Sequence, residues 1–104
     1  AAPQPETRGN VTHGEVVYAD NFGNLVTNIP AGALEQEGET LVEVKGRRIT
    51  GLAQTFSHGD SSPGGVLLAL VGSHGYLEVA VRNGSAALTL GAGVGEPVRV
   101  TAVP

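Results

Sequence analysis

Glycine and proline interrupt this chain so often that only short elements of secondary structure fit between them. Sixteen glycines and six prolines are spread over 104 residues. The apolar runs that remain, such as VLLALVG (66–72) and YLEVAVR (76–82), are short and bounded by turn formers, which is typical of strands. A single all-β domain is therefore predicted, because a chain of this length rarely holds two domains.

The alternation of apolar and polar residues places the strands. LVEVKG (41–46) has the period of a half-buried strand, and a turn near Lys45 and Gly46 returns the chain into the next one. The predicted strands are residues 14–19, 25–29, 41–46, 47–56, 66–72, 76–82 and 96–103. Open sheet edges promote aggregation, so we predict that these strands close into a small antiparallel β-barrel.

Two segments between the strands are candidates for short helices. AGALEQEG (31–38) predicts one or two helical turns that end at Gly38. In NGSAALTLG (83–91), Ser85 is a suitable N-cap and Gly91 a suitable end. The expected fold is thus a β-barrel with one or two short helices.

The start of the chain differs in composition from the remainder. AAPQPETRGN (1–10) is polar and rich in proline, and it does not begin with Met. We predict a linker over residues 1–13 and a barrel domain over residues 14–104. The simplest interpretation is that the domain comes from a longer protein, with an engineered or processed start as the alternative.

Charge and composition exclude several kinds of partner. A net charge of −4 with six basic residues argues against a nucleic-acid surface. No apolar run approaches the roughly 18 residues of a membrane-spanning helix. With no cysteine there is no disulfide framework, which is compatible with the cytoplasm, and we expect a cytoplasmic protein.

The residues most often used in catalysis are not arranged for it. His13, His58 and His74 have no spacing that would bring them together around a metal ion, so no metal site is expected. Ser57, His58 and Asp60 are too close in sequence for the geometry of a catalytic triad, and no oxyanion donor is indicated.

The stretch YADNFGNLVTNI (18–29) contains more than a turn requires. Phe22 lies among turn formers, where it either plugs the end of the barrel or offers a flat face to a ring-shaped ligand. The amide of Asn24 has the groups needed for a bidentate contact with the N6/N7 edge of adenine. Stacking of a base on an aromatic side chain contributes roughly 1–3 kcal/mol.

A second stretch, GSHGYLEVAVRNGSAA (72–87), carries a carboxylate in an apolar strand. Glu78 either points outward on the polar face of the strand or is a buried carboxylate that needs a partner.

Together, GEVVYADNFGNLVTNI and GSHGYLEVAVRNGSAALTLG resemble the C-terminal domain of the S-adenosylmethionine hydroxide adenosyltransferases, relatives of the fluorinase and chlorinase enzymes. The resemblance runs from Gly14 to Val103. It implies an N-terminal α/β domain in the full-length protein, assembly as a homotrimer, and S-adenosylmethionine bound between the N-terminal domain of one subunit and the C-terminal domain of its neighbour. Hydroxide would attack the ribose C5′ and release adenosine and methionine, with S-adenosylmethionine as substrate and no cofactor.

The resemblance also implies roles for residues of this chain. The adenine contacts would be Phe22 and Asn24, a second aromatic, Phe56, and backbone groups around Val81 to Asn83. No catalytic residue is expected, because the residues that activate water belong to the N-terminal domain.

At the other end of the substrate, the resemblance assigns Asp20 to the methionine ammonium and Ser73 to the methionine carboxylate. The halide-using relatives have Arg where this chain has His74, and members usually have Asn where it has Arg82. An alternative function, from another class, is a non-catalytic β-barrel module that holds a protein partner with the same loops.

Overall fold

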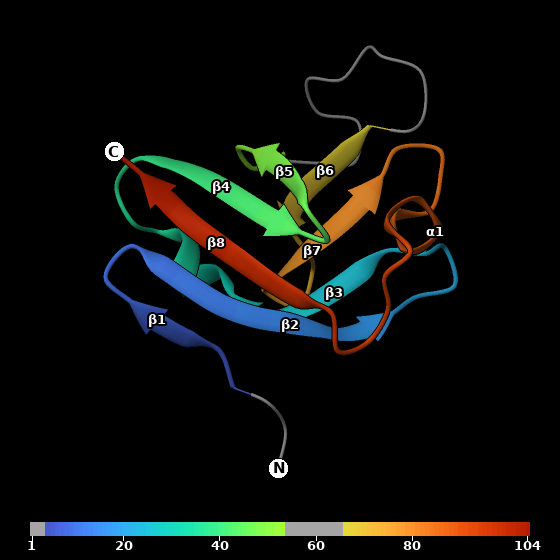
Figure 1. Cartoon of the computed structure of the whole chain (residues 1–104), viewed down its shortest axis with the longest axis horizontal. Coiled ribbons are helices and arrows are strands. Elements are labelled where there is room, and N and C mark those ends of the chain that lie inside the picture. Colours follow the sequence, from blue (N-terminus) through green and yellow to red (C-terminus); the bar gives the residue numbers. More distant parts are fainter. Residues whose placement is uncertain (1–3, 54–65) are drawn as a thin grey trace.

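The computed structural model describes residues 4–53 and 66–104, which form eight strands and two short helices. Figure 1 shows the strands wrapped around a common interior. In chain order the elements are β1 (Glu6–Arg8), β2 (Val11–Ala19), β3 (Leu25–Pro30), the 3-10 helix η1 (Ala31–Leu34), β4 (Glu39–Val44), β5 (Arg47–Thr50), β6 (Leu67–Val71), β7 (Tyr76–Val81), α1 (Ala86–Leu90) and β8 (Pro97–Val103).

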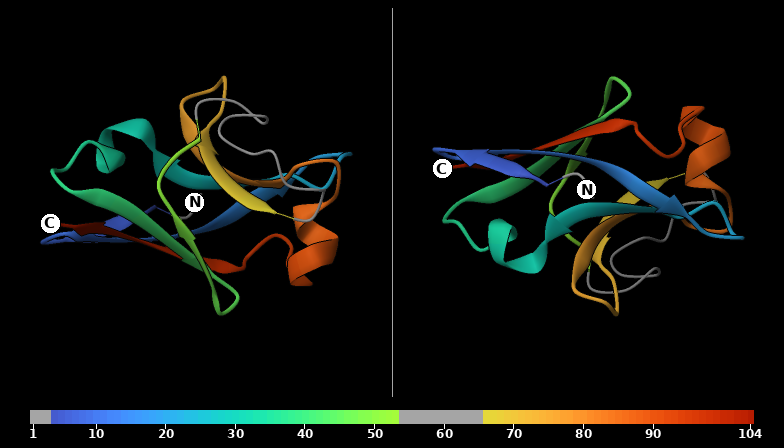
Figure 2. Two further views of the ribbon diagram at one scale, coloured as in Figure 1. Left: turned by 90° about the horizontal axis from the view of Figure 1, so that it is seen from above. Right: turned by 90° about the horizontal axis from the view of Figure 1, so that it is seen from below.

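The strands form one antiparallel sheet in the order β5-β4-β8-β2-β3-β7-β6, with β1 paired to β2 beside this path. The nine-residue strand β2 serves both halves, because residues 11–15 pair with β8 and residues 16–19 pair with β3. A bridge between Ala53 and Leu70 brings the chain after β5 to β6. The sheet is therefore a nearly closed barrel, as Figure 2 shows from above and below, and the predicted fold class is confirmed.

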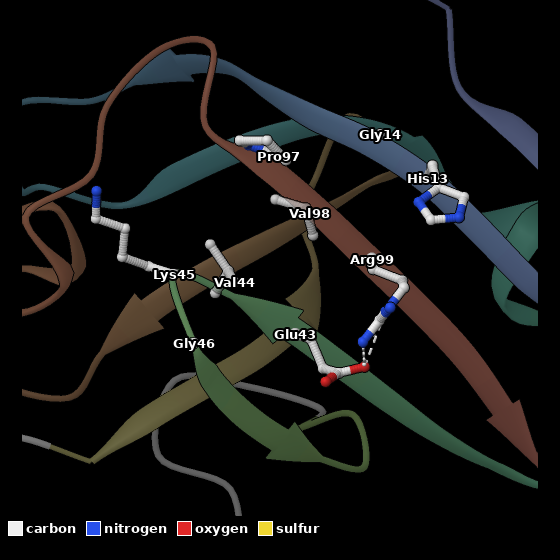
Figure 3. A pocket seen from close by; sticks show the side chains of 9 residues that line it. All are labelled: His13, Gly14, Glu43, Val44, Lys45, Gly46, Pro97, Val98 and Arg99. Atoms are coloured by element: carbon white, nitrogen blue, oxygen red, sulfur yellow. Dashed lines mark hydrogen bonds and ion pairs between the residues drawn. The ribbon is translucent and has the colours of Figure 1, made fainter.

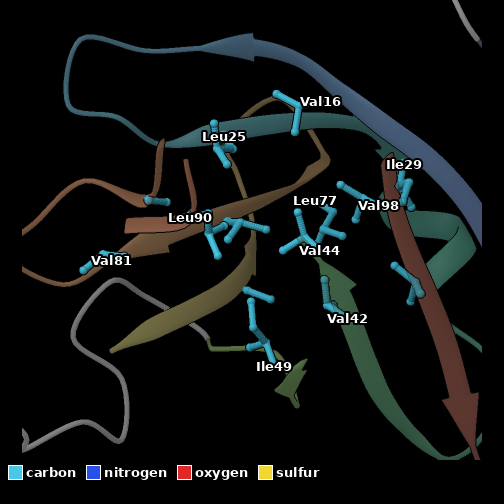
Figure 4. Close-up of a cluster of buried hydrophobic side chains, with 14 residues drawn as sticks. Val16, Leu25, Ile29, Val42, Val44, Ile49, Leu77, Val81, Leu90 and Val98 are labelled. Carbon is cyan, nitrogen blue, oxygen red and sulfur yellow. The ribbon is translucent and has the colours of Figure 1, made fainter. Parts of the chain in front are cut away.

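The core of the barrel is built from aliphatic side chains on the inner faces of the strands. In β3 and β4 buried residues alternate with more exposed ones, as expected for strands with one face inward. Figure 4 shows the cluster, which consists of Val16, Leu25, Ile29, Val42, Val44, Ile49, Ala69, Leu77, Val79, Val81, Ala86, Leu90, Val98 and Val100.

A buried threonine completes the hydrogen bonding where the ladder between β3 and β7 is irregular. The pairing shifts register between Val26 and Pro30. The hydroxyl of Thr27 donates to the carbonyl of Leu77 at 2.8 Å and accepts from the amide of Ile29 at 3.1 Å. This side chain takes over bonds that the regular ladder would have made, and it fixes the course of β3 beside β7.

The structure corrects the predicted linker. Strand β1 and the beginning of β2 lie within residues 1–13, and Thr7 and Thr12 form a hydroxyl–hydroxyl hydrogen bond of 3.0 Å between them. The three residues of β1 are exposed, so this strand carries no apolar pattern that sequence reasoning would detect.

Both predicted helices are present and α1 has its predicted caps, whereas the first helix ends at Leu34 rather than at Gly38. Ser85 accepts a hydrogen bond from the amide of Leu88 at the start of α1, and Gly91 ends the helix in the left-handed conformation. The segment 31–38 forms a single 3-10 turn, η1. The hairpin between β4 and β5 turns at residues 45–46 as expected.

Candidate functional site

The turn between β2 and β3 is organised by the carboxylate of Asp20. Its Oδ1 accepts hydrogen bonds from the amides of Phe22 at 2.9 Å and Asn24 at 3.0 Å, and its Oδ2 accepts one from Asn24 Nδ2 at 3.0 Å. Burial raises the pKa of Asp20, but the N–H groups of Asn24, Phe22 and Gly23 that lie around the carboxylate outweigh it and hold the pKa below its usual value. The carboxylate is thus ionised and largely occupied by the turn itself.

The side chain of Phe22 projects from this turn into solvent. It is 78% exposed, so the interpretation of Phe22 as a plug for the barrel end is wrong. An aromatic ring this exposed gains little from the fold and is available to a ligand or partner. Asn24, two residues further along the turn, is half-buried, with its amide held by Asp20.

The same turn is fastened to the beginning of α1. The carbonyl of Gly23 accepts a hydrogen bond of 2.9 Å from the amide of Ala87. Gly23 has a φ of +83°, and a Cβ atom at this position would collide with the side chain of Ser85. Position 23 therefore has to be glycine, both because its φ is positive and because a side chain would collide with Ser85. The hydrogen bond from Ala87 fixes the turn that carries Phe22 and Asn24 relative to α1.

Val81 and Asn83 lie at the same end of the barrel as this turn. Strands β3 and β7 are antiparallel with Leu25 opposite Val79, so the end of β7 lies beside the start of β3. The segment after β7 turns through Asn83, which is exposed, and leads into α1 (Figure 1). The proposed adenine contacts that the structure describes are therefore brought together, whereas Phe56 lies outside the described residues.

Ser73 and His74 lie at the other end of the ladder between β3 and β7. They form the turn before β7, in which the amide of Gly72 donates to the carbonyl of Tyr76 at 2.9 Å, and both side chains are exposed. From Tyr76 to Val81 the strand extends roughly 17 Å at 3.3 Å per residue. The two groups of predicted site residues are thus separated by the length of a strand and do not meet directly.

Glu78 lies between these two groups. It is opposite Val26 of β3 and Leu70 of β6, on the outer face of the sheet. Its carboxylate lies against the backbone of Gly72, where a Cβ atom would collide with it.

Charged residues at both ends of the site change the pKa of Glu78. Burial raises the pKa of Glu78, the charge of Asp20 raises it further, and His74 lowers it. Sequence reasoning noted Glu78 but did not place it among the site residues. The only signal was a lone carboxylate in an apolar strand.

A separate groove lies over β2, β8 and β4 (Figure 3). This cavity of about 370 Å³ contains Arg99, which donates to Glu43 Oε1 at 2.7 and 3.0 Å. Arg48 adds an ion pair of 3.6 Å to the same carboxylate. These charges satisfy one another at the surface, and exposed pairs of this kind contribute about 1 kcal/mol or less.

Within residues 4–53 and 66–104, no group of three or more histidine, aspartate or glutamate side chains is arranged to hold a metal ion. In the same part of the chain, none of the helices has the length and apolar character needed to cross a membrane.

Fold and site together define a small antiparallel barrel domain in which the predicted site residues that the structure describes lie on the turns at the two ends of β7. Residues 14–99 match the model of the SAM hydroxide adenosyltransferase C-terminal domain, and the chain belongs to this family. This finding confirms the resemblance seen in the sequence.

Two relatives share much of the sequence. The (R)-S-adenosyl-L-methionine hydrolase of Thermus thermophilus is 42% identical over 90 residues, which cover 84% of this chain and 31% of the relative. The protein of the same name from Salinispora arenicola is 40% identical over 99 residues, which cover 95% of this chain and 35% of the relative. The chain thus spans about a third of the length of these relatives.

Solved structures share the fold. A conserved protein from Thermotoga maritima superposes with a TM-score of 0.76 at 27% identity, over 97% of this chain and 40% of that one. A conserved hypothetical protein from Thermus thermophilus superposes with a TM-score of 0.68 at 39% identity, over 95% of this chain and 36% of that one.

Proposed function

We propose that this chain is the substrate-binding domain of an S-adenosylmethionine hydrolase, which forms adenosine and methionine by attack of hydroxide at the ribose C5′. The observation that carries the proposal is the turn at residues 20–24, which holds an ordered asparagine amide two residues after an exposed aromatic side chain. Membership of the family and relatives named as S-adenosylmethionine hydrolases support it.

The turn has the groups that an adenine ring needs. Phe22 offers a face for stacking, which contributes roughly 1–3 kcal/mol per base. Asn24 uses one N–H of its amide on Asp20, so its second N–H and its oxygen are left for the N7 and N6 positions of adenine. Backbone groups around residues 81–83 lie at the same end and would complete the adenine contacts.

The methionine part would extend along the outer face of β7 towards Ser73 and His74. The distance between the two ends suits a ligand with a nucleoside at one end and an amino acid at the other. Holding both ends fixes the position of C5′ between them, and positioning of this kind accelerates a displacement without any acid or base in this domain.

The remaining parts of the proposal concern the whole protein. We infer that an N-terminal α/β domain from a neighbouring subunit covers the site and activates the water, that the full-length protein is a homotrimer, and that it acts in the cytoplasm with no cofactor beyond its substrate.

A calorimetric titration of the chain with adenosine, together with an assay of adenosine release by the full-length protein, tests the proposal. We expect binding by the chain and release by the whole protein. Failure of the intact protein either to bind S-adenosylmethionine and adenosine or to release adenosine would refute the proposal.

Asn24→Ala tests the assigned adenine contact. This variant should weaken adenosine binding by roughly 1–3 kcal/mol, the range for loss of a bidentate base contact. Asn21→Ala is the matched control, since Asn21 is an exposed asparagine of the same turn. Equal affinities of the wild type and the Asn24 variant for adenosine would show that Asn24 does not contact adenine.

A further inference from the structure

We propose that Glu78, which the family resemblance does not assign, recognises the cationic amino acid end of the ligand. The inference rests on the function proposed above. It is based on the position of Glu78 between the two ends of the site and on the use that the fold makes of the other carboxylate, Asp20.

Asp20 has little capacity left for a ligand cation. A carboxylate accepts about four hydrogen bonds, and Asp20 already accepts three, two on Oδ1 and one on Oδ2. These bonds hold the turn that carries Phe22 and Asn24. A ligand ammonium that took Asp20 as its main partner would compete with the bonds that order the adenine contacts.

Glu78 has the opposite character. Among the residues that the structure describes, no hydrogen bond or ion pair reaches its carboxylate. Its cross-strand neighbours, Val26 and Leu70, are apolar, and Leu70 is only 4% exposed. Glu78 itself is only partly buried, so its charge is partly hydrated, but its apolar neighbours still disfavour the ionised form. A bound cation would provide a partner for that form.

The position of Glu78 fits the same role. It lies two residues into β7 from the turn that contains Ser73 and His74, and three residues before Val81 at the adenine end. A ligand stretched between the two ends has its amino acid portion beside β7 at this point. Gly72 leaves the space in which the carboxylate lies, so the side chain is held against the backbone of the neighbouring turn.

The charged groups around Glu78 can be named element by element. Asp20 faces it from the turn after β2, and His74 faces it from the turn before β7, while the partners on β3 and β6 carry no charge. As pH falls, Glu78 is protonated first, because its pKa is raised and that of Asp20 is lowered. Cation binding should therefore weaken as pH falls through the pKa of Glu78, which is raised above the ordinary glutamate value of 4.5.

The test compares three ligands on wild-type chain, Glu78→Gln and the control Glu39→Gln, which makes the same charge change on an exposed residue of β4. S-adenosylmethionine carries an ammonium and a sulfonium, S-adenosylhomocysteine carries only the ammonium, and adenosine carries neither. We expect Glu78→Gln to weaken S-adenosylmethionine roughly tenfold, as for a hydrogen bond to a charged group, and to leave adenosine within twofold. A loss shared by S-adenosylhomocysteine assigns the contact to the ammonium, and a loss confined to S-adenosylmethionine assigns it to the sulfonium.

The affinity for S-adenosylmethionine, measured at a series of pH values, adds a second test. Its pH dependence would not differ between wild type and Glu78→Gln if Glu78 had only a structural role. Binding of S-adenosylmethionine by the wild type should weaken on acidification, and the dependence should be smaller in Glu78→Gln, including in a His74→Gln background. Equal losses for adenosine and S-adenosylmethionine, or no loss for either, would overturn the assignment of Glu78. Absence of binding of all three ligands to the wild-type chain and the intact protein would instead refute the proposed function.

Discussion

The hydrogen bonds of Asp20 lead to a quantitative prediction about the turn at residues 20–24. Asp20→Asn keeps the shape of the side chain but removes its charge. The new amide group would place a donor opposite Asn24 Nδ2, where the carboxylate now accepts a bond of 3.0 Å. The two bonds from the amides of Phe22 and Asn24 would remain but become neutral.

The size of the effect follows from these three bonds. A hydrogen bond to a charged group contributes about 1.5–3 kcal/mol, and a neutral one about 1 kcal/mol. Asp20 is only partly buried, so solvent screening reduces the difference. We expect the free energy of unfolding to fall by about 1–2 kcal/mol, or roughly 4–16 °C in Tm for a domain of this size.

The pH dependence of this effect has a definite sign. The pKa of Asp20 in the folded protein lies below its ordinary value of 3.8. A carboxyl with a depressed pKa adds stability above the unfolded-state pKa and loses it as pH falls through the folded-state pKa. The stability difference between wild type and Asp20→Asn should be full at pH 5 and above, and it should shrink below about pH 3.8.

Urea unfolding at a series of pH values is the assay, with Glu37→Gln as an exposed control that makes the same charge change. An Asp20→Asn variant whose free energy of unfolding stays within about 0.3 kcal/mol of wild type at neutral pH would refute the reasoning, because surface changes without such contacts fall in that range.

Two further substitutions test contacts that position the site. Gly23→Ala should lower the free energy of unfolding by about 2 kcal/mol or more, since it forces a positive φ on alanine and a collision with Ser85. Gly32→Ala has open space around it and should be nearly neutral; thermal unfolding that ranks the two variants equally would contradict this explanation. Thr27→Val should cost about 1–3 kcal/mol, because two buried backbone groups lose their hydroxyl partner. Thr50→Val, on an exposed residue, is the urea-unfolding control, and equal midpoints would contradict the assigned role of the hydroxyl.

The sequence predicted the barrel well where the chain has local signals. The alternation in residues 41–46, the cap at Ser85 and the end at Gly91 all depend on neighbours in sequence, and the structure confirms each of them. Strand β1 was missed because its side chains are exposed and its pairing with β2 leaves no apolar pattern.

The site was predicted less completely, because its geometry depends on contacts between distant segments. The turn at residues 20–24 was recognised from its composition, but the hydrogen bond from Ala87 to Gly23 joins residues more than sixty positions apart. The place of Glu78 between two turns also follows from the register of β7 with β3 and β6, which no spacing in the sequence reveals.

The contacts around the turn at residues 20–24 order it before any ligand is bound. Asp20 orders the backbone of the turn, and Ala87 fastens it to α1, with no ligand required for either contact. A ligand that meets an already ordered site loses less free energy to ordering the protein, so more of its contact energy remains for binding. If the proposed function holds, substitutions at Gly23 and at Asn24 should differ in kind. A substitution at Gly23 loosens the turn and therefore weakens both binding and stability. A substitution at Asn24 removes a ligand contact but leaves the bonds from the two backbone amides to Asp20 in place.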